Sequence, residues 1–595
     1  MKVTPSSDAC KPSSPFGHNK ILLLILTCTL RSIITHYSPL MDCDEVYNYW
    51  EPLHFMLFGT GLQTWEYSPE FRLRTFAYLT PLAKLGDILK LFGVRDKILL
   101  FTILRSILAG FTGYCEFYFA HGVAKVWGNT IGWSTLLLSL CSPGMFHSSG
   151  ALLPSATAMQ LVLLSTGNLC QDPRASGVSR SIFIGLIATL AIGWPFCAVC
   201  WIPIGLYAVL QAFCSGDDPS NRFKNATFVL LRTVIHAAII QLIVCIIDYQ
   251  WYQALTVPSL NIFMYNAAAG GDELYGIEPA SYYLKNLALN FNFTLVLALV
   301  APFAVLVNEV FKRKQGDDDN GASSPPSFGL RLAVISPLLL WFLLIGPRPH
   351  KEERFVFPVY PLIVLAGAIG LENVIRLTGA LCDMLVSSSS RGGKRQIQMW
   401  LRATALIVCA MFSSLRMLAL FNYYNAPVQL FTALNQEILS SSRSTSNTNI
   451  CVGGEWHRFP SSFFLPQGSN LAFLPSEFKG QLPQPFTPGG VAVEPLQPFN
   501  DENREEVSRY IAGGISNCDY AVELMLTEDK LLGRKAPAIS LLMEAAGEKG
   551  RWNMTSSVTF LDAERTHGLH RMMYIPRVSD CRIVLVDYAL WKREK

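Results

Sequence analysis

The chain alternates between long apolar runs and short polar connections, a pattern that predicts a polytopic membrane protein. A helix needs about 20 predominantly apolar residues to cross a bilayer. On that basis we predict eleven spans, some of them completed by their interfacial flanks. They cover residues 21–38, 98–120, 131–146, 151–170, 181–194, 196–213, 227–248, 286–311, 330–346, 355–378 and 400–421. Beyond residue 421 the chain becomes polar, and apolar residues alternate there as in strands, for example over residues 582–588.

The composition supports this division. Of the 595 residues, 51% are hydrophobic and only 15% are charged, which is too apolar for a soluble protein of this size. The net charge is +4, and no helix or stripe gathers the basic residues, so nucleic acid is not an expected partner. We predict a cytosolic tail (residues 1–20), a polytopic α-helical membrane domain (21–421) and a soluble mixed α/β domain (422–595). The first span has no cleavage site after it and is expected to be retained.

Basic residues fall in every second connection between the predicted spans, and this sets the orientation. Short cytosolic loops carry an excess of Lys and Arg. Here the basic connections contain Lys125, Arg174, Arg180, Arg222, Lys224, residues 312–314 and residues 391–402. We therefore assign these connections to the cytosol. The polar segments 39–97, 249–285, 347–354 and 422–595 then share the opposite compartment.

The soluble region has two features that depend on this compartment. It contains Cys451, Cys518 and Cys581, so one disulfide with one odd thiol can form if the surroundings are oxidising, and the sequence leaves the disulfide state open. It also contains an N-glycosylation sequon at Asn553, whose use the sequence leaves open. The sequon at Asn225 is expected to stay unmodified because its connection is cytosolic.

A heptapeptide of high charge density, His350 to Val356, interrupts the apolar runs late in the membrane domain. Charge at a membrane boundary is costly and therefore suggests a functional site. The alternative is an interfacial anchor whose Lys and Arg side chains reach toward headgroups. The orientation favours function, because Lys351 and Arg354 lie on the side that is normally poor in basic residues.

Three carboxylates, Asp42, Asp44 and Glu45, follow directly after the first span. They could simply start a helix, since acidic groups suit a helix N-terminus and Asp is a good cap. They could equally supply a general base, because partial desolvation raises a carboxylate pKa toward a useful value. Spacing alone does not separate the two interpretations.

Aromatic, acidic and basic residues interleave further along the same side of the membrane. Trp65, Glu66 and Arg72 lie in the first loop, and Asp272 and Tyr275 lie in a glycine-rich second loop. Such residues suit sugar binding, although Trp and Tyr also form interfacial belts and glycines also mark turns. Carboxylates together with a basic cluster at a bilayer surface fit transfer from a lipid-linked phosphate donor. The cations would hold the leaving phosphate while a carboxylate deprotonates the acceptor.

At these residues the sequence resembles the glycosyltransferase family 22 mannosyltransferases of the GT-C membrane superfamily. The resemblance is carried by residues 42–45, 48–52, 61–67, 274–279, 290–292, 350–358 and 455–463. Within the family these segments look like those of the enzymes that use dolichyl-phosphate mannose to build lipid-linked oligosaccharides. The one departure within the charged motif is Val356 in place of a commoner Leu.

The resemblance implies a GT-C fold in the endoplasmic reticulum membrane with a lumenal active site. It implies α1,2 transfer of mannose from dolichyl-phosphate mannose to dolichyl-diphosphate-linked oligomannose, at the six- and eight-mannose stages of N-glycan assembly. A β-linked donor and an α-linked product require a single inverting displacement. No metal or other cofactor is expected, because the basic residues could replace a metal.

For the mechanism, we expect Asp44 to take the proton from the acceptor hydroxyl and Glu45 to orient that hydroxyl. A base role for Asp42, and a swap of Asp44 and Glu45, remain as alternatives. The expected donor-phosphate ligands are His350, Lys351 and Arg354. The expected acceptor contacts are Asp42, Trp65, Glu66, Arg72, Asp272 and Tyr275.

Two other functions compete with this hypothesis. A mannosyltransferase acting on glycosylphosphatidylinositol (GPI) precursors would share the acidic and basic markers, but residues 455–463 and the soluble domain argue against it. A membrane transporter could also line a pathway with buried charges. Transporters usually show internal repeats, and we find no clear repeat in this sequence.

Overall fold

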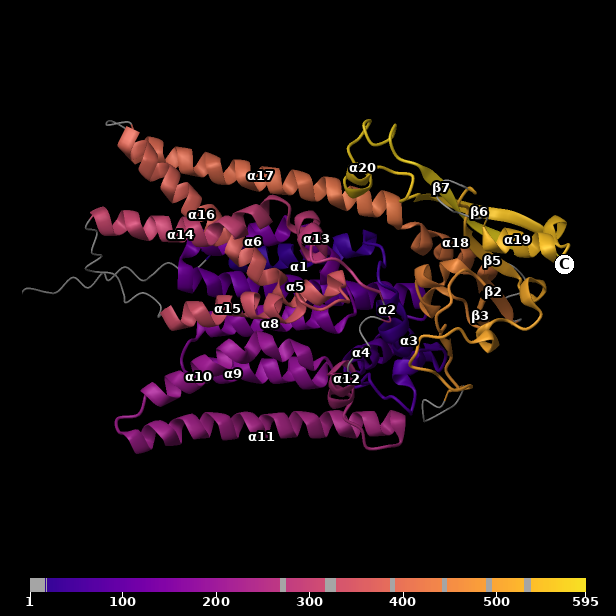
Figure 1. The fold of residues 1–595 in the computed structure, drawn as a ribbon, viewed down its shortest axis with the longest axis horizontal. Coiled ribbons are helices and arrows are strands. Elements are labelled where there is room, and N and C mark those ends of the chain that lie inside the picture. Colours follow the sequence, from indigo (N-terminus) through magenta and orange to yellow (C-terminus); the bar gives the residue numbers. More distant parts are fainter. Residues whose placement is uncertain are drawn as a thin grey trace, which may run out of the picture.

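Long helices run alongside one another in an elongated bundle, and the strands of the C-terminal domain gather at one end of it (Figure 1). The computed structural model describes residues 16, 17, 19–267, 274, 276–315, 328–385, 391–440, 447–487, 495–528 and 537–594. Most of the predicted N-terminal tail lies outside the described residues.

Seven helical segments of the described chain are long and apolar enough to cross a membrane, and two sharply bent helix pairs raise the number to nine. The seven are α1 (Lys20–Tyr37), α5 (Lys97–Trp127), η4 with α10 (Pro195–Cys214), α11 (Pro219–Tyr252), α15 (Phe328–Ile345), η6 with α16 (Glu353–Ala380) and α17 (Arg395–Tyr424). The bent pairs are α7 (Pro143–Ser149) with α8 (Pro154–Gln171), and α13 (Tyr282–Phe291) with α14 (Phe293–Gln315).

These nine segments match nine of the eleven predicted spans, and the other two are helices too short to be counted as candidate spans. The span expected at 131–146 is α6 (Asn129–Leu140), and the span expected at 181–194 is α9 (Ala175–Leu186) continued by η3 (Ile187–Ala191). The 12 residues of α6 rise only about 18 Å, well short of a bilayer core. Pro143 follows soon after α6, and Pro195 soon after η3; proline cannot continue a helix.

The bundle is built around α16 (Tyr360–Leu385), which packs against α14 and α6. An 18-residue apolar stretch of η6 with α16 is 94% buried, against 11% for the corresponding stretch of α11 at the edge of the bundle (Figure 1). Close approach of α14 requires Gly370, because a Cβ there would lie 2.0 Å from the carbonyl oxygen of Leu297. Small residues at such crossings are typical of membrane helices.

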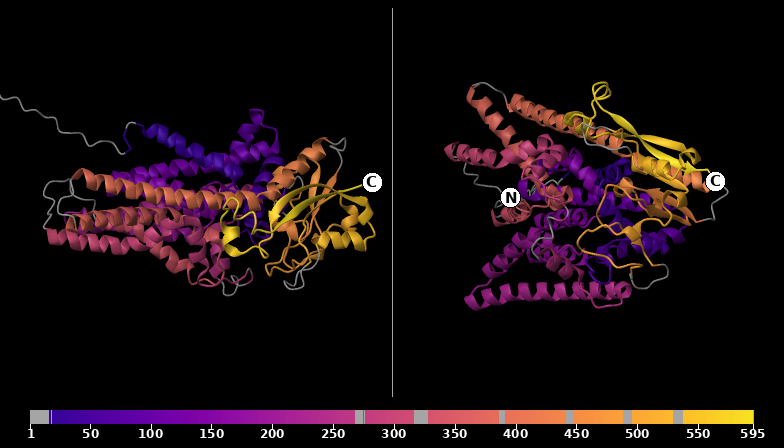
Figure 2. Two further views of the ribbon diagram at one scale, coloured as in Figure 1. Left: turned by 90° about the horizontal axis from the view of Figure 1, so that it is seen from above. Right: turned by 45° about the vertical axis from the view of Figure 1, so that its right-hand side comes forward.

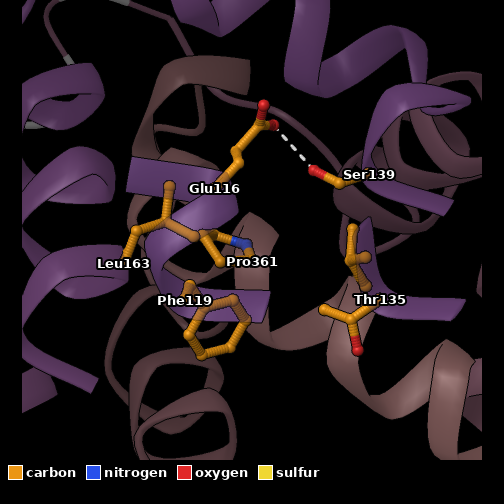
Figure 3. A pocket seen from close by; sticks show the side chains of 7 residues that line it. Glu116, Phe119, Thr135, Ser139, Leu163 and Pro361 are labelled. Carbon is orange, nitrogen blue, oxygen red and sulfur yellow. Dashed lines mark hydrogen bonds between the residues drawn. The ribbon is translucent and has the colours of Figure 1, made fainter. Parts of the chain in front are cut away.

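A buried ion pair joins three helices inside the bundle. Arg31 of α1 is fully buried and donates to both carboxylate oxygens of Glu116 on α5, at 2.6 and 2.8 Å. Ser139 of α6 donates to the same carboxylate at 2.6 Å, as Figure 3 shows. Because a charge inside a membrane must be paired, these contacts fix α1 against α5 and α6.

The C-terminal domain is a five-stranded mixed sheet with helices, reached through α18 (Ala426–Ser440). The strand order is β3-β2-β5-β7-β6, with β2 parallel to β3 and β5, and β7 antiparallel to β5 and β6. Its elements are β2 (Thr448–Val452), β3 (Ser469–Phe473), β5 (Tyr520–Leu524), α19 (Ala538–Ala545), β6 (Trp552–Leu561), α20 (Gly568–Met572) and β7 (Leu585–Arg593). Of the three cysteines that the sequence left open, Cys451 and Cys518 form a disulfide and Cys581 is free.

The first large loop connects this domain to the bundle. It forms α2 (Cys43–Glu45), η1 (Val46–Trp50), α3 (Glu51–Phe58), β1 (Leu62–Gln63), η2 (Trp65–Tyr67) and α4 (Thr80–Leu91). Strand β1 pairs antiparallel with β4 (Gln484–Pro485) of the C-terminal domain. In both views of Figure 2 the C-terminal domain lies at one end of the helices. The predicted polytopic α-helical fold with a mixed α/β C-terminal domain is therefore confirmed.

Candidate active site

Arg354 joins the acidic turn of the first loop to the charged heptapeptide. Its Nη1 donates to the two carboxylate oxygens of Asp42 at 2.5 and 2.7 Å, and its Nη2 donates to Asp44 at 2.5 Å. Nη2 also pairs with Glu352. One guanidinium thus contacts three carboxylates. Asp42 and Asp44 come from positions more than 300 residues before Arg354, and the fold brings them beside Glu352 at the start of η6 (Glu353–Val359).

The two aspartates of this cluster differ in charge behaviour. Burial raises the pKa of Asp42 to about 6, although the nearby Arg354 opposes this rise. Burial also acts on Asp44, but the positive charges of Arg354 and Arg74 outweigh it and hold the pKa of Asp44 below its ordinary value. The Asp44 side chain is 41% exposed, against 25% for Asp42. Asp44 is therefore the more accessible carboxylate and is ionised at neutral pH.

His350 and Lys351 make different contacts, although they are adjacent. His350 Nε2 lies 3.3 Å from Glu352 Oε1, and its Nδ1 lies 3.0 Å from the carbonyl oxygen of Gly276. The hydrogen bond with Glu352 raises the pKa of His350, so this ring is a cation candidate beside Arg354. Lys351 is buried, and its Nζ donates to the carbonyl oxygens of Glu278 at 3.1 Å and of Arg348. Lys351 thus fastens the heptapeptide to the second loop.

The other carboxylate of the heptapeptide, Glu353, faces a separate polar group. Its Oε1 accepts a hydrogen bond from Asn290 Nδ2 at 2.7 Å and lies 3.8 Å from His147 Nε2. Asn290 also donates to the Tyr360 hydroxyl at 3.1 Å. Glu352 therefore belongs to the cationic cluster, whereas Glu353 holds α7, α13 and α16 together.

Glu45 lies inside the protein and supports the turn that carries the aspartates. It is 4% exposed, and its Oε1 accepts hydrogen bonds from Trp50 Nε1 at 2.9 Å and from the Leu152 backbone N–H at 3.0 Å. Arg105 of α5 secures the other end of this turn by donating to the carbonyl oxygen of Ser38 at 2.7 Å. The acidic turn is therefore fixed between α1, α5 and the α7–α8 corner.

A further buried carboxylate, Glu51, was not predicted from the sequence. It is fully buried and accepts four hydrogen bonds: from Ser461 Oγ at 2.8 Å, from Ser462 N and Oγ at 2.6 and 2.7 Å, and from the Leu62 N–H at 2.9 Å. The sequence signal is that Glu51 and its three partner residues all lie within segments that carried the family resemblance. Through Glu51, the helix that follows the acidic turn is attached to the C-terminal domain.

Arg74, which was not predicted as a site residue, lies beside the aspartates. Arg74 pairs with Glu66 at 2.7 Å, donates to the Tyr49 hydroxyl at 2.7 Å and interacts with the charge of Asp44. Arg72 instead donates to the carbonyl oxygen of Pro69. Side chains two residues apart point to the same face only in a regular extended backbone. The left-handed φ of 48° at Arg72 interrupts that backbone, so Arg72 and Arg74 do not share a face.

The remaining predicted acceptor contacts are only partly described. Trp65 is half-buried, with its ring 5.2 Å from that of Tyr265 and 5.1 Å from that of Phe71. Asp272 and Tyr275 lie outside the described residues.

The acidic turn also has the spacing of a metal site. The potential ligand atoms of Asp42, Cys43 and Asp44 all lie within 4.8 Å of one another. However, Arg354 already balances both carboxylates, and burial raises the pKa of the Cys43 thiol, which disfavours the thiolate that would bind a metal. This donor set fits an arginine better than a divalent cation.

Comparison with known proteins decides the family. The model of the Alg9-like mannosyltransferase family matches residues 22–466, a range that includes the acidic turn, Arg354 and both serines that bind Glu51. The chain belongs to this family. Its members include α-1,2-mannosyltransferase ALG9 of Mus musculus and of Homo sapiens, each 36% identical over 94% of this chain and 86% of the relative. The ALG9 of Saccharomyces cerevisiae is 29% identical over 93% of this chain and 92% of the relative.

More distant similarities are weaker. GPI mannosyltransferase 3 of Candida albicans is 22% identical over 55% of this chain and 59% of the relative. Among solved structures, ArnT from Cupriavidus metallidurans bound to undecaprenyl phosphate is 12% identical, covers 77% of this chain and 86% of its own, and has a TM-score of 0.47.

Family membership confirms the predicted enzyme class: the protein is a multi-pass membrane glycosyltransferase of the mannosyltransferase type. The alternative hypothesis of a membrane transporter is therefore rejected in favour of a mannosyltransferase.

Proposed function

We propose that the protein transfers mannose in α1,2 linkage from dolichyl-phosphate mannose to dolichyl-diphosphate-linked oligomannose, at the six- and eight-mannose stages of N-glycan assembly. Three relatives that match nearly the whole chain are named α-1,2-mannosyltransferase. The GPI mannosyltransferase matches only 55% of it. The observation that carries the chemistry is the meeting of Asp44 with Arg354.

The donor phosphate binds Arg354 in this mechanism. A phosphodiester donor carries one negative charge, and a second develops on the phosphate as the bond from C1 of mannose to oxygen breaks. The guanidinium fork suits two phosphate oxygens, and protonated His350 adds a second cation. To reach Arg354, the phosphate displaces a carboxylate. Asp44 is the most exposed of the three and is the one released.

Asp44, once released, acts as the general base. It takes the proton from the acceptor 2-hydroxyl while that oxygen attacks C1 from the face opposite the phosphate, so that the β-linked donor gives an α-linked product. Asp42 is the alternative base. Glu45 orients the acceptor indirectly, by holding the turn on which Asp44 lies. Lys351 likewise acts through the loop that it fastens.

The acceptor glycan contacts Trp65, Glu66, Arg72, Asp272 and Tyr275 in this proposal. The active site faces the lumen of the endoplasmic reticulum. Two observations support that orientation: basic residues gather in the opposite connections, and the C-terminal domain contains a disulfide, which requires an oxidising compartment.

The proposal is tested by reconstituting the purified protein in liposomes with dolichyl-phosphate mannose and lipid-linked acceptors of five to eight mannoses. We expect single extension of the six- and eight-mannose acceptors only, giving products that an α1,2-specific mannosidase shortens. Extension of a GPI precursor in a parallel reaction, with none of the dolichyl-linked acceptors, would assign the protein to the other branch of the family.

A further inference from the structure

We propose that Asn553 is a site of N-linked glycosylation, a modification that mannosyl transfer does not require. Asn553-Met554-Thr555 has the acceptor pattern Asn-X-Thr, with X other than proline. The side chains of Asn553 and Thr555 are both exposed. They lie on β6, which is an edge strand of the C-terminal sheet, at the end of the molecule away from most of the helices (Figure 1).

A β-bulge lies within this sequon. Met554 pairs with Trp591 and Ser556 pairs with Leu590, so Thr555 is left out of the register between them. The extra residue of a bulge leaves the ladder and bends the strand. In the folded protein, Asn553 Nδ2 donates to Glu594 and Thr555 Oγ1 donates to Glu437 at 3.2 Å, and all of these contacts are on the surface.

The order of synthesis keeps the sequon accessible. Among the described strands, β6 pairs with β7 alone. Strand β7 (Leu585–Arg593) and Glu594 follow β6 in the chain. Before that segment joins the sheet, Asn553 has neither its partner strand nor its carboxylate contact. The sequon is therefore unpaired until β7 pairs with β6, and modification precedes that step.

The two other sequons in the sequence lie at helices of the bundle and not on the C-terminal sheet. Asn225 lies near the start of α11, in the connection that the basic residues assign to the cytosol. Asn292 lies at the bend between α13 and α14, inside a candidate span, and its Nδ2 is buried without a partner. We expect a single glycan, at Asn553.

The modification is a group transfer from a lipid-diphosphate-linked oligosaccharide. A bond forms between Asn553 Nδ2 and C1 of the first sugar, while the bond between C1 and the diphosphate oxygen breaks. The lipid diphosphate leaves with the electron pair, and the transferring enzyme accepts a proton from Nδ2.

The test uses the full chain expressed in cells and treated with peptide N-glycosidase. We expect loss of mass equal to one glycan. Asn553→Gln and Thr555→Ala should abolish the shift, Thr555→Ser should retain it, and Asn225→Gln and Asn292→Gln should leave it unchanged. Absence of any shift in the unaltered protein, or its persistence in Asn553→Gln, would overturn the proposal.

This inference rests on the lumenal orientation in the proposed function, and a second variant separates the two. A glycine-serine linker bearing an efficient sequon is added after residue 595. If the added sequon is modified and Asn553 is not, the orientation stands and the Asn553 site is wrong. If neither is modified, the lumenal orientation fails as well. Mannosyl transfer by Asn553→Gln should equal that of the unaltered protein, so activity serves as an independent control for folding.

Discussion

Asp44 and Glu51 lie seven residues apart in the same loop, and their carboxylates have opposite surroundings. The Asp44 side chain is 41% exposed and shares one guanidinium with two other carboxylates. Glu51 is fully buried and accepts four hydrogen bonds, three of them from Ser461 and Ser462 of the C-terminal domain.

The difference distinguishes a carboxylate that can take part in the reaction, Asp44, from one that stabilises the fold, Glu51. A carboxylate that accepts a proton must be reachable by substrate and must be able to exchange partners, as Asp44 can. A carboxylate that joins two parts of the chain must keep every partner, because a buried polar group left unsatisfied costs about 1–3 kcal/mol. Substitutions at Asp44 should therefore change the reaction and leave stability intact, whereas substitutions at Glu51 should do the reverse.

The largest effect is expected for Asp44→Asn. Removing the general base should lower the turnover number about 10²- to 10⁴-fold, while the thermal unfolding temperature in detergent and donor binding stay close to those of the unaltered protein. Transfer assays with enzyme amounts normalised by quantitative immunoblot measure the change. Near-normal turnover would remove Asp44 from the mechanism.

Arg354→Ala should come next, because it removes the phosphate ligand and leaves three carboxylates without their common cation. We expect a loss of about 10²- to 10³-fold in turnover, similar to the loss of one preorganised electrostatic group. Arg354→Lys keeps the charge without the fork and should recover only part of this activity. The dependence of rate on donor concentration is the measurement, and an unchanged dependence in both variants would exclude donor binding by Arg354.

Glu51→Ala should mainly lower stability. The serine hydroxyls and two backbone N–H groups lose their acceptor, so we expect destabilisation of about 3 kcal/mol or more. Thermal unfolding in detergent measures this effect. Glu70→Ala, at an exposed carboxylate in the same loop, is the matched control and should unfold as the unaltered protein does. If Glu51→Ala unfolds normally, the attachment of the C-terminal domain does not depend on this contact.

The pH dependence of the rate distinguishes the two candidate bases. The pKa of Asp42 is raised to about 6, so a rate that depends on ionised Asp42 falls as the pH drops through 6. Asp44 has a lowered pKa and stays ionised there, so we expect no loss of rate near pH 6. On the alkaline side, the rate should fall as His350, whose pKa is raised, loses its proton. An acidic decline near pH 6 that Asp42→Asn abolishes would make Asp42 the base.

The smallest effect is expected from metal removal. Arg354 already balances Asp42 and Asp44, so treatment with EDTA should leave transfer within about twofold of the control. The comparison is made by assaying transfer after dialysis. Loss of activity that Mn²⁺ or Mg²⁺ restores would show that the acidic turn binds a cation during the reaction.

Much of this arrangement follows from sequence pattern. Apolar runs predict the long helices, and the basic connections correctly bring the acidic turn and the charged heptapeptide to the same side, where Arg354 meets Asp42 and Asp44. These features depend on composition and on local order, which the sequence contains directly.

The roles of individual side chains within the cluster could not be predicted in the same way. Glu45 and Asp44 are adjacent, but a single helical step turns one toward Trp50 and the other toward Arg354. Lys351 contacts a backbone carbonyl of the second loop, and Glu51 contacts two serines about 410 residues later in the chain. Such choices depend on tertiary contacts, for which local pattern gives no signal.

Single-turnover transfer to the six-mannose acceptor, with enzyme in excess and both substrates saturating, isolates the chemical step from binding and so reports on the general base itself. We expect the unaltered protein to form a product wholly sensitive to α1,2-specific mannosidase, Asp42→Asn to form the same product, and Asp44→Asn to form it at least about 100-fold more slowly. A mannosidase-resistant product from the unaltered protein, or formation by Asp44→Asn at the normal rate, would contradict this expectation.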